Sequence, residues 1–377
     1  MTSYNIVHQL YYDMQLKFWK KKPASEPVKR SAAREWGNAL MFAVVVSTFV
    51  RWATFEAYAI PTPSMEKSLL VGDHLFVSKL HYGPRTPMTP LQVPLTHQTI
   101  WGTDITSYSD AIRLKPFRLP GFSEIKRNDA VVFNFPAEEG HPMDQKTHYV
   151  KRCIGLAGDT LEIRDRQVYI NGKAVNSPEN QQYTYFVATD KVLQDKFFLD
   201  RDITDVYPAP GGYVVNTTAE KAQELASLEF VKEATLQQAR AGEAEPGIFP
   251  NAPDRYTWNR DHYGPLYIPK QGATVAITPE TLPLYEKIIL DYEQNGQAEV
   301  RDGRLYLNGK EAKRYTFQQN YYFMMGDNRH NSLDSRYWGF VPEDHVVGKA
   351  VFVWLSVDEN GGLLNKVRWS RLFSLAD

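Results

Sequence analysis

The residues most able to do chemistry begin with a serine on a stiffened segment. Ser64 follows Pro61, Thr62 and Pro63, and the two prolines hold the backbone before the serine in extended conformations. A turn at Gly72 closes the segment. A hydroxyl presented in this way is a candidate nucleophile, but a serine becomes one only with a base beside it.

Four basic side chains could serve Ser64. His148 with Asp144 could complete a Ser-His-Asp set, although the sequence has no nucleophile-elbow pattern. Lys67 gives a formal Ser-x-x-Lys pattern, but the helix and the Lys-Thr-Gly companion that this pattern needs are missing. Lys79 lies in the polar tail of a predicted strand, and we expect it to be solvated.

The fourth base, Lys151, interrupts an apolar strand with the sequence HYVKRCIGLAGD. A period of two puts Tyr149, Lys151 and Cys153 on one face and Arg152 on the other, so one of two adjacent cations must point to the less polar side. A partly buried lysine has a lowered pKa and can be neutral near pH 7, as a general base requires. The alternative is an exposed strand lysine in a salt bridge.

A third segment, residues 321–350, is rich in Gly, Asp and Asn between apolar strands. Ser332, Asp334 and Arg336 cluster in it. The carboxylate and the guanidinium can form an ion pair, and Ser332 can orient a neighbouring group. These residue types by themselves do not indicate the function of this loop.

An apolar run precedes all three segments. Residues 36–55 contain one charge, Arg51, and as a helix would rise about 30 Å, the thickness of a bilayer core. The alternative is a buried core helix. No acceptable cleavage site follows, so we predict a retained anchor. Residues 1–35 carry a net charge of +4 and the remainder −5, which predicts a cytoplasmic head and an exported body.

The composition excludes other classes. The 377 residues have a net charge of −1, which argues against a dedicated nucleic-acid-binding protein. The one cysteine, Cys153, rules out an intramolecular disulfide and a Cys-based zinc site.

Strand patterns dominate the exported body, and residues 83–122 predict a proline-rich loop. The predicted strands are 130–135, 147–154, 160–163 and 167–170. The sequence RDRQVYINGK at 164–173 is similar to RDGRLYLNGK at 301–310. Each is a strand that enters an Asn-Gly hairpin turn.

In residues 176–299 helix patterns alternate with strand patterns, which predicts an α+β insertion. Its first part gives a βαββαβ order, and residues 284–292 have helical spacing. A capping box of Thr217 and Glu220 is expected to begin the second helix of the βαββαβ part. The predicted elements are a strand at 183–189, a helix at 190–200, a strand at 213–215, a helix from Thr217 to Leu228 and a strand at 230–236.

Together, these segments resemble the type I signal peptidases, the membrane-bound leader peptidases of bacteria. The matching motifs, in the family's order, are PTPSM, LLVGDHLFVSK, NDAVVFNFP, YVKRCIGLAGD and FMMGDNRHNSLDSRYWGFVPEDHVVGKA. The resemblance implies a mainly β fold, with an antiparallel β catalytic domain behind one N-terminal transmembrane helix. The expected parts are a basic head at 1–35, an anchor at 36–55, a catalytic domain at 56–175 and 300–377, and an insertion at 176–299.

The resemblance also implies a Ser/Lys dyad, with Ser64 as nucleophile and Lys151 as general base. Thr62 would supply the hydroxyl that forms an oxyanion hole with the Ser64 N–H, and Ser332 would orient the lysine. The residues that would support this loop through an ion pair are Asp334 and Arg336.

An extended substrate would lie beside Tyr149–Val150 and the strand that leads to Ile60. Small pockets lined by Ile60, Leu69 and Val150 would select small side chains, as in Ala-x-Ala-like sites. The implied partners are preproteins with signal peptides, the lipid bilayer and the export machinery, and no cofactor or metal ion is implied. The implied location is the bacterial inner membrane, with the N-terminus in the cytoplasm and the catalytic domain on the periplasmic side.

The sequence departs from the family's pattern at four positions. Lys67 stands where proline is common and Asn128 where glycine is common, while Pro63 and Ala157 replace a small residue and a proline. None of the four removes a catalytic group. Two other interpretations remain: a penicillin-binding-like acyl transferase that uses Ser64 with Lys67, and a membrane-anchored scaffold without catalysis that binds a partner through the insertion.

Overall fold

The computed structural model describes residues 31–376, apart from 177, 179, 359–361 and 363–365. Helix α2 (Ala32–Ala53) is the one helix in these ranges that is long and apolar enough to cross a membrane, and none of its residues is buried. It matches the predicted anchor, although it ends before Phe55, where strand β1 begins. Residues 49–377 form one compact unit, and the description below concerns this unit.

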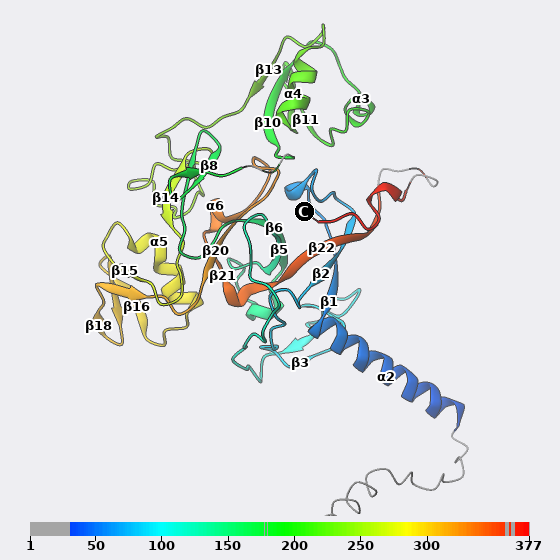
Figure 1. Ribbon diagram of the computed structural model, residues 1–377, viewed down its shortest axis with the longest axis vertical. Coiled ribbons are helices and arrows are strands. Elements are labelled where there is room, and N and C mark those ends of the chain that lie inside the picture. The colour runs from blue at the N-terminus through cyan, green and yellow to red at the C-terminus, as the bar shows by residue number, and fades with distance from the viewer. Residues whose placement is uncertain (1–30, 177, 179, 359–361, 363–365, 377) are drawn as a thin grey trace, which may run out of the picture. The chain divides into compact units, whose positions relative to one another are not determined.

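An antiparallel sheet of seven strands forms the centre of this unit (Figure 1). In spatial order its strands are β1 (Phe55–Ala59), β2 (Asp73–Ser78), β22 (Val346–Ser356), β5 (Ala130–Asn134), β6 (His148–Gly155), β20 (Tyr321–Met325) and β21 (Val341–Pro342). β5 and β20 are buried at every position, as their continuous apolar sequences predict. The expected mainly β, antiparallel fold is confirmed.

One part of β6 has a free edge. β5 pairs with β6 from His148 to Arg152, whereas β20 pairs on the other side only from Arg152 to Gly155. The backbone between His148 and Lys151 therefore has a strand on one side alone. A half-paired strand can accept another extended chain.

The two similar sequences at 164–173 and 301–310 form parts of two similar three-stranded meanders. β7 (Thr160–Arg164), β8 (Gln167–Ile170) and β9 (Lys173–Ala174) pair in order, as do β16 (Ala298–Arg301), β17 (Arg304–Leu307) and β18 (Lys310–Glu311). Asn171-Gly172 and Asn308-Gly309 turn each second hairpin with positive φ at both residues, as a type I′ turn requires. β14 (Tyr263–Tyr267) adds to β7 in the first meander.

The predicted βαββαβ unit is present, and we call residues 183–236 the inserted unit. It consists of β10 (Tyr183–Ala188), α3 (Asp195–Leu199), β11 (Asp205–Ala209), β12 (Gly212–Thr217), α4 (Ala219–Ala226) and β13 (Glu233–Leu236). Its sheet has the order β11-β12-β10-β13 and its own apolar core, so β11 is an edge strand. The predicted capping box is wrong by one residue: Thr218 caps α4 by accepting from the Lys221 N–H, while Thr217 ends β12.

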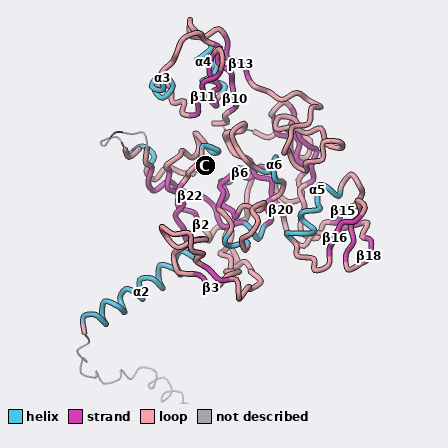
Figure 2. Tube along the Cα trace, turned by 180° about the vertical axis from the view of Figure 1, so that it is seen from behind, coloured by secondary structure: helices cyan, strands magenta, loops and turns pink. Residues whose placement is uncertain are grey.

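The remaining elements are short (Figure 2). Residues 83–122 form mainly loop, as predicted, with one pairing of β3 (Leu91–Gln92) and β4 (Tyr108–Ser109). The helical spacing at 284–292 corresponds to α5 (Leu282–Lys287) and the π-helical turn Ile288–Tyr292. β15 (Thr274–Ala276) lies inside the predicted insertion but pairs with β19 (Arg314–Thr316) outside it. The domain boundaries at 176 and 299 therefore stay a prediction.

Candidate active site

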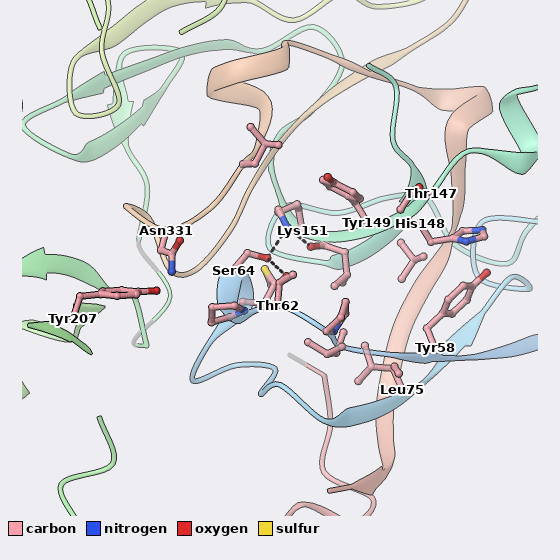
Figure 3. Close-up of a pocket in the computed structure, with 18 residues that line it drawn as sticks. Tyr58, Thr62, Ser64, Leu75, Thr147, His148, Tyr149, Lys151, Tyr207 and Asn331 are labelled. Carbon is pink, nitrogen blue, oxygen red and sulfur yellow. Dashed lines mark hydrogen bonds between the residues drawn. The ribbon is translucent and has the colours of Figure 1, made fainter. Parts of the chain in front are cut away.

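The structure brings Ser64 and Lys151 together (Figure 3). Ser64 lies in the 3₁₀ turn Pro63–Met65, and Lys151 lies on β6 at the end of its free edge. Lys151 Nζ donates to Ser64 Oγ over 2.7 Å, and the two residues are 4% and 8% exposed. A hydroxyl and an amine are thus in direct contact in a nearly dry environment, which is the geometry of a nucleophile with its base.

Burial lowers the pKa of Lys151 to about 8, although the nearby carboxylates of Asp334 and Asp327 act in the opposite direction. A charged ammonium is poorly solvated in this position, so its neutral form is favoured. Lys151 Nζ also donates to the Val150 carbonyl over 3.0 Å. A substantial fraction of Lys151 is therefore neutral slightly above neutral pH, as a proton acceptor must be.

Thr62 stands directly before the turn. Its Oγ1 lies 3.4 Å from Ser64 Oγ, and its extended backbone makes it the N-cap residue of the turn, with no side-chain capping bond. The N–H groups of a first helical turn have no intrahelical partner. The Thr62 hydroxyl thus lies within hydrogen-bond distance of the Ser64 hydroxyl, and its role in an oxyanion hole with the Ser64 N–H stays a prediction.

The loop after β20 contains the third predicted cluster. Arg336 Nη2 donates to Asp334 Oδ2 over 2.8 Å, and both side chains are fully buried. Burial raises the pKa of Asp334, but Arg336 more than offsets this and keeps the pKa below its ordinary value. Ser332 Oγ is buried in this loop. The acceptors of the Lys151 ammonium are Ser64 Oγ and the Val150 carbonyl, and the orientation of Lys151 by Ser332 stays a prediction.

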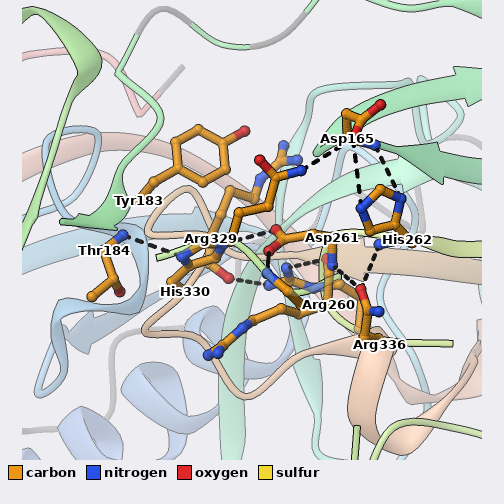
Figure 4. A network of polar contacts seen from close by, with 12 residues as sticks. Asp165, Tyr183, Thr184, Arg260, Asp261, His262, Arg329, His330 and Arg336 are labelled. Carbon is orange, nitrogen blue, oxygen red and sulfur yellow. Dashed lines mark hydrogen bonds and ion pairs between the residues drawn. The ribbon is translucent and has the colours of Figure 1, made fainter. Parts of the chain in front are cut away.

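A histidine network fixes this loop to its surroundings (Figure 4). The buried ring of His330 contacts Asp261 Oδ1 over 2.8 Å through Nε2 and accepts from the Thr184 N–H over 3.2 Å through Nδ1. Burial lowers the pKa of His330 against the opposing effect of Asp261. The loop is therefore tied both to β10 and to the segment that precedes β14.

The other three bases are engaged elsewhere. Asp144 accepts from the Met88 and Thr89 N–H groups, while His148 packs on His97 with 4.4 Å between ring centroids. The Ser-His-Asp alternative therefore has no support. Burial lowers the pKa of His148 to about 3.

The two remaining lysines form ion pairs. Lys67 Nζ lies 2.7 Å from Asp202 Oδ2, so it does not serve Ser64. Lys79 Nζ lies 2.7 Å from Glu56 Oε2, and the Lys79 side chain is only 14% exposed. The expectation that Lys79 is solvated was wrong, because its partner lies on the neighbouring strand β1.

A cavity of about 580 Å³ opens beside Ser64 and Lys151. Of the predicted substrate-binding residues, Ile60, Tyr149 and Val150 line it. Leu69 does not line the cavity; it is fully buried in the same apolar cluster as Ile60. Residues not singled out from the sequence complete the lining, and they include Tyr58, Met65, Leu75, Val132, Tyr207, Asn331 and Leu333.

The backbone accounts for two departures from the family's pattern. Asn128 has φ of +70°, a conformation that asparagine tolerates better than most residues when it replaces glycine. Lys67 has φ of +72°, which proline cannot adopt. The chain after Ser64 therefore follows a different local course from one with proline at this position, and it directs Lys67 to Asp202 in the inserted unit.

Comparisons with known proteins agree with this geometry. The chain is 28% identical over 338 residues to "Signal peptidase I" of Buchnera aphidicola subsp. Acyrthosiphon pisum, which covers 85% of this chain and 75% of the relative. It is 24% identical over 333 residues to "Signal peptidase I" of Pseudomonas aeruginosa, with 85% and 72% covered, and 24% identical over 347 residues to that of Haemophilus influenzae, with 90% and 74% covered.

The model of one family matches residues 33–223 and 270–355, which is most of the chain. The matched ranges include the apolar helix, Ser64, Lys151 and the loop after β20. The chain belongs to the signal peptidase family, peptidase S26.

Proposed function

We propose that this protein is a membrane-bound serine endopeptidase that removes signal peptides from exported preproteins. The observation that carries the proposal is the 2.7 Å hydrogen bond between Lys151 Nζ and Ser64 Oγ in a buried site. Family membership and the relatives named signal peptidase I support the same substrate class. Ser64 is the proposed nucleophile, and Lys151 is the proposed general base.

The reaction proceeds through two acyl transfers. Ser64 Oγ bonds to the scissile carbonyl carbon while Lys151 Nζ takes the hydroxyl proton, and Thr62 Oγ1 with the Ser64 N–H stabilises the oxyanion. The C–N bond then breaks, and the proton on Lys151 passes to the leaving amine. A water molecule, deprotonated by Lys151, then attacks the acyl carbon. The bond between this carbon and Ser64 Oγ breaks, Lys151 returns the proton to Ser64 Oγ, and the signal peptide leaves as a carboxylic acid that ionises in water.

The free edge of β6 supports the proposed substrate position. The cavity is lined from one side by Tyr58–Ile60 at the end of β1 and from the other by Thr147–Lys151. An extended signal peptide can pair with the unpartnered backbone of Tyr149–Val150. Ile60 and Val150 give the cavity apolar walls at this position, where the proposed specificity is for small side chains in Ala-x-Ala-like sites.

Helix α2 supports membrane anchoring, and the positive head at 1–35 supports a cytoplasmic N-terminus. The catalytic domain would then lie on the periplasmic side of the inner membrane. Preproteins reach that side through the export machinery, which is the proposed functional partner.

Processing of a purified preprotein tests the proposal. Ser64→Ala and Lys151→Ala should each abolish cleavage, because the attacking oxygen or its proton acceptor is lost. Lys67→Ala is the matched lysine control and should retain most activity, since Lys67 pairs with Asp202. Full activity in Lys151→Ala would refute the dyad, and covalent labelling of Ser64 by penicillin that depends on Lys67 would favour the acyl-transferase alternative.

A further inference from the structure

The inserted unit contributes to the cavity beside Ser64. Tyr207 of β11 lines it together with Asn331 and Leu333 of the loop after β20. Tyr207 and Leu333 are 54% and 51% exposed, although both are large and partly apolar. Exposed groups of this kind next to a reactive serine are available to a ligand.

These side chains lie on a defined side of Ser64. In Figure 3, Ser64 lies between Tyr207 and Asn331 on one side and Tyr58 and His148 on the other. The free backbone edge of β6 lies on the second side. A chain whose acyl half pairs with β6 must therefore continue past Ser64 toward Tyr207, which is the path of the leaving group.

The position of Tyr207 is fixed by a buried carboxylate two residues before it. Asp205 is 6% exposed, and its Oδ2 accepts from the side-chain amides of Asn216 over 2.8 Å, Asn328 over 3.1 Å and Asn331 over 2.7 Å. Two of these amides belong to the loop after β20. The edge strand that carries Tyr207 is thereby bound to the loop that carries Leu333.

A second set of contacts joins the inserted unit to the nucleophile segment. Lys67 pairs with Asp202, and the Thr204 hydroxyl donates to Glu66 Oε1 over 2.9 Å. Residues 202–207 thus contact both the segment that follows Ser64 and the loop after β20. A surface held in this way keeps its shape when substrate arrives, which favours selective binding.

We infer that Tyr207, Leu333 and Asn331 form the binding site for the first residues of the mature polypeptide, directly after the scissile bond. The inference rests on the proposed signal peptidase activity. The Tyr207 ring and Leu333 contact the side chain that follows the bond and favour apolar ones, while the Asn331 amide faces the polypeptide backbone. The inserted unit is then a specificity element for the leaving group.

A preprotein series that varies only the residue after the bond tests this. We expect Tyr207→Ala to lower kcat/KM about tenfold when that residue is Leu or Phe and by less than twofold when it is Gly, since one apolar contact discriminates on this scale. Tyr207→Phe should retain the preference. Leu199→Ala, an exposed leucine on α3 that does not line the cavity, is the matched control.

A peptide ester with the same acyl half and a methoxide leaving group tests this inference separately from the proposed peptidase activity on which it rests. Tyr207→Ala should hydrolyse this ester at the wild-type rate. An equal loss on every substrate, ester included, would overturn the inference while leaving the peptidase assignment intact. Failure of the wild-type protein to cleave any preprotein would instead overturn the proposed function.

Discussion

Lys151 connects the chemistry of the site to pH. Its pKa of about 8 arises from burial, against the effect of Asp334 and Asp327. A general base works in its neutral form, so kcat/KM should rise with pH and level off above an apparent pKa near 8. We expect about a tenfold loss for each pH unit below that value, measured on a fixed peptide substrate. A flat profile between pH 6 and 9 would contradict the role of Lys151.

At the level of single residues, the sequence was informative where chemistry and periodicity agreed. The prolines around Thr62 and the apolar strand around Lys151 made Ser64 and Lys151 candidates. The resemblance to the signal peptidases then predicted them as the two partners that the structure brings together. Lys79 was misjudged, because its burial depends on Glu56, a carboxylate of the paired strand β1. Such a partner depends on strand register, which no local pattern contains.

The loop after β20 approaches the nucleophile closely at Gly326. A Cβ added there would lie 2.4 Å from the Ser64 carbonyl oxygen and 2.2 Å from Ser332 Oγ. The Ser64 carbonyl belongs to the backbone and can move only together with Ser64. Gly326→Ala should therefore displace Ser64 from Lys151. We expect kcat to fall about a hundredfold, as a displacement of roughly 1 Å can cause.

Steady-state kinetics on a preprotein substrate measure this effect. Gly37→Ala is the control, because an added Cβ there meets nothing within 4 Å. Wild-type kcat in the Gly326→Ala variant would show that the loop does not position Ser64.

Local sequence patterns predicted the elements better than their boundaries. The Asn-Gly pairs correctly predicted a hairpin turn in each meander. Positive φ at two successive residues depends only on the local sequence. The cap of α4 is Thr218 rather than Thr217. Either of the two adjacent threonines could cap the helix, but Thr217 is the last residue of β12, which leaves Thr218 as the cap. β11 was implied by the βαββαβ order but not located, and the role of Tyr207 therefore had no signal in the sequence.

On the scale of the whole molecule, the attachment of the inserted unit depends on one buried carboxylate. Asp205→Ala would remove the carboxylate that accepts from three side-chain amides, of which Asn328 would keep the Pro63 carbonyl as acceptor. This should lower the free energy of unfolding by about 1–3 kcal/mol. Lys67→Ala removes an ion pair whose partner Asp202 is 71% exposed, and it should cost less than about 1 kcal/mol.

Urea unfolding of the two variants measures this contrast. Equal stability in both would mean that the amide cluster around Asp205 does not hold the inserted unit in place. The cluster was not predictable from the sequence, because Asp205, Asn216, Asn328 and Asn331 meet only once the chain has folded.

The buried Lys151 ammonium also has a consequence for folding equilibria. In an unfolded chain its pKa is close to 10.5, and in the folded protein it is about 8. Between these two values the unfolded chain holds a proton that the native state has released, so Lys151 makes the native state more stable as pH rises through this window. Below about pH 8 the native state carries a charged, poorly solvated group, at a cost of about 3 kcal/mol. The lowered proton affinity that suits Lys151 to accept the Ser64 proton thus destabilises the fold at neutral and acidic pH.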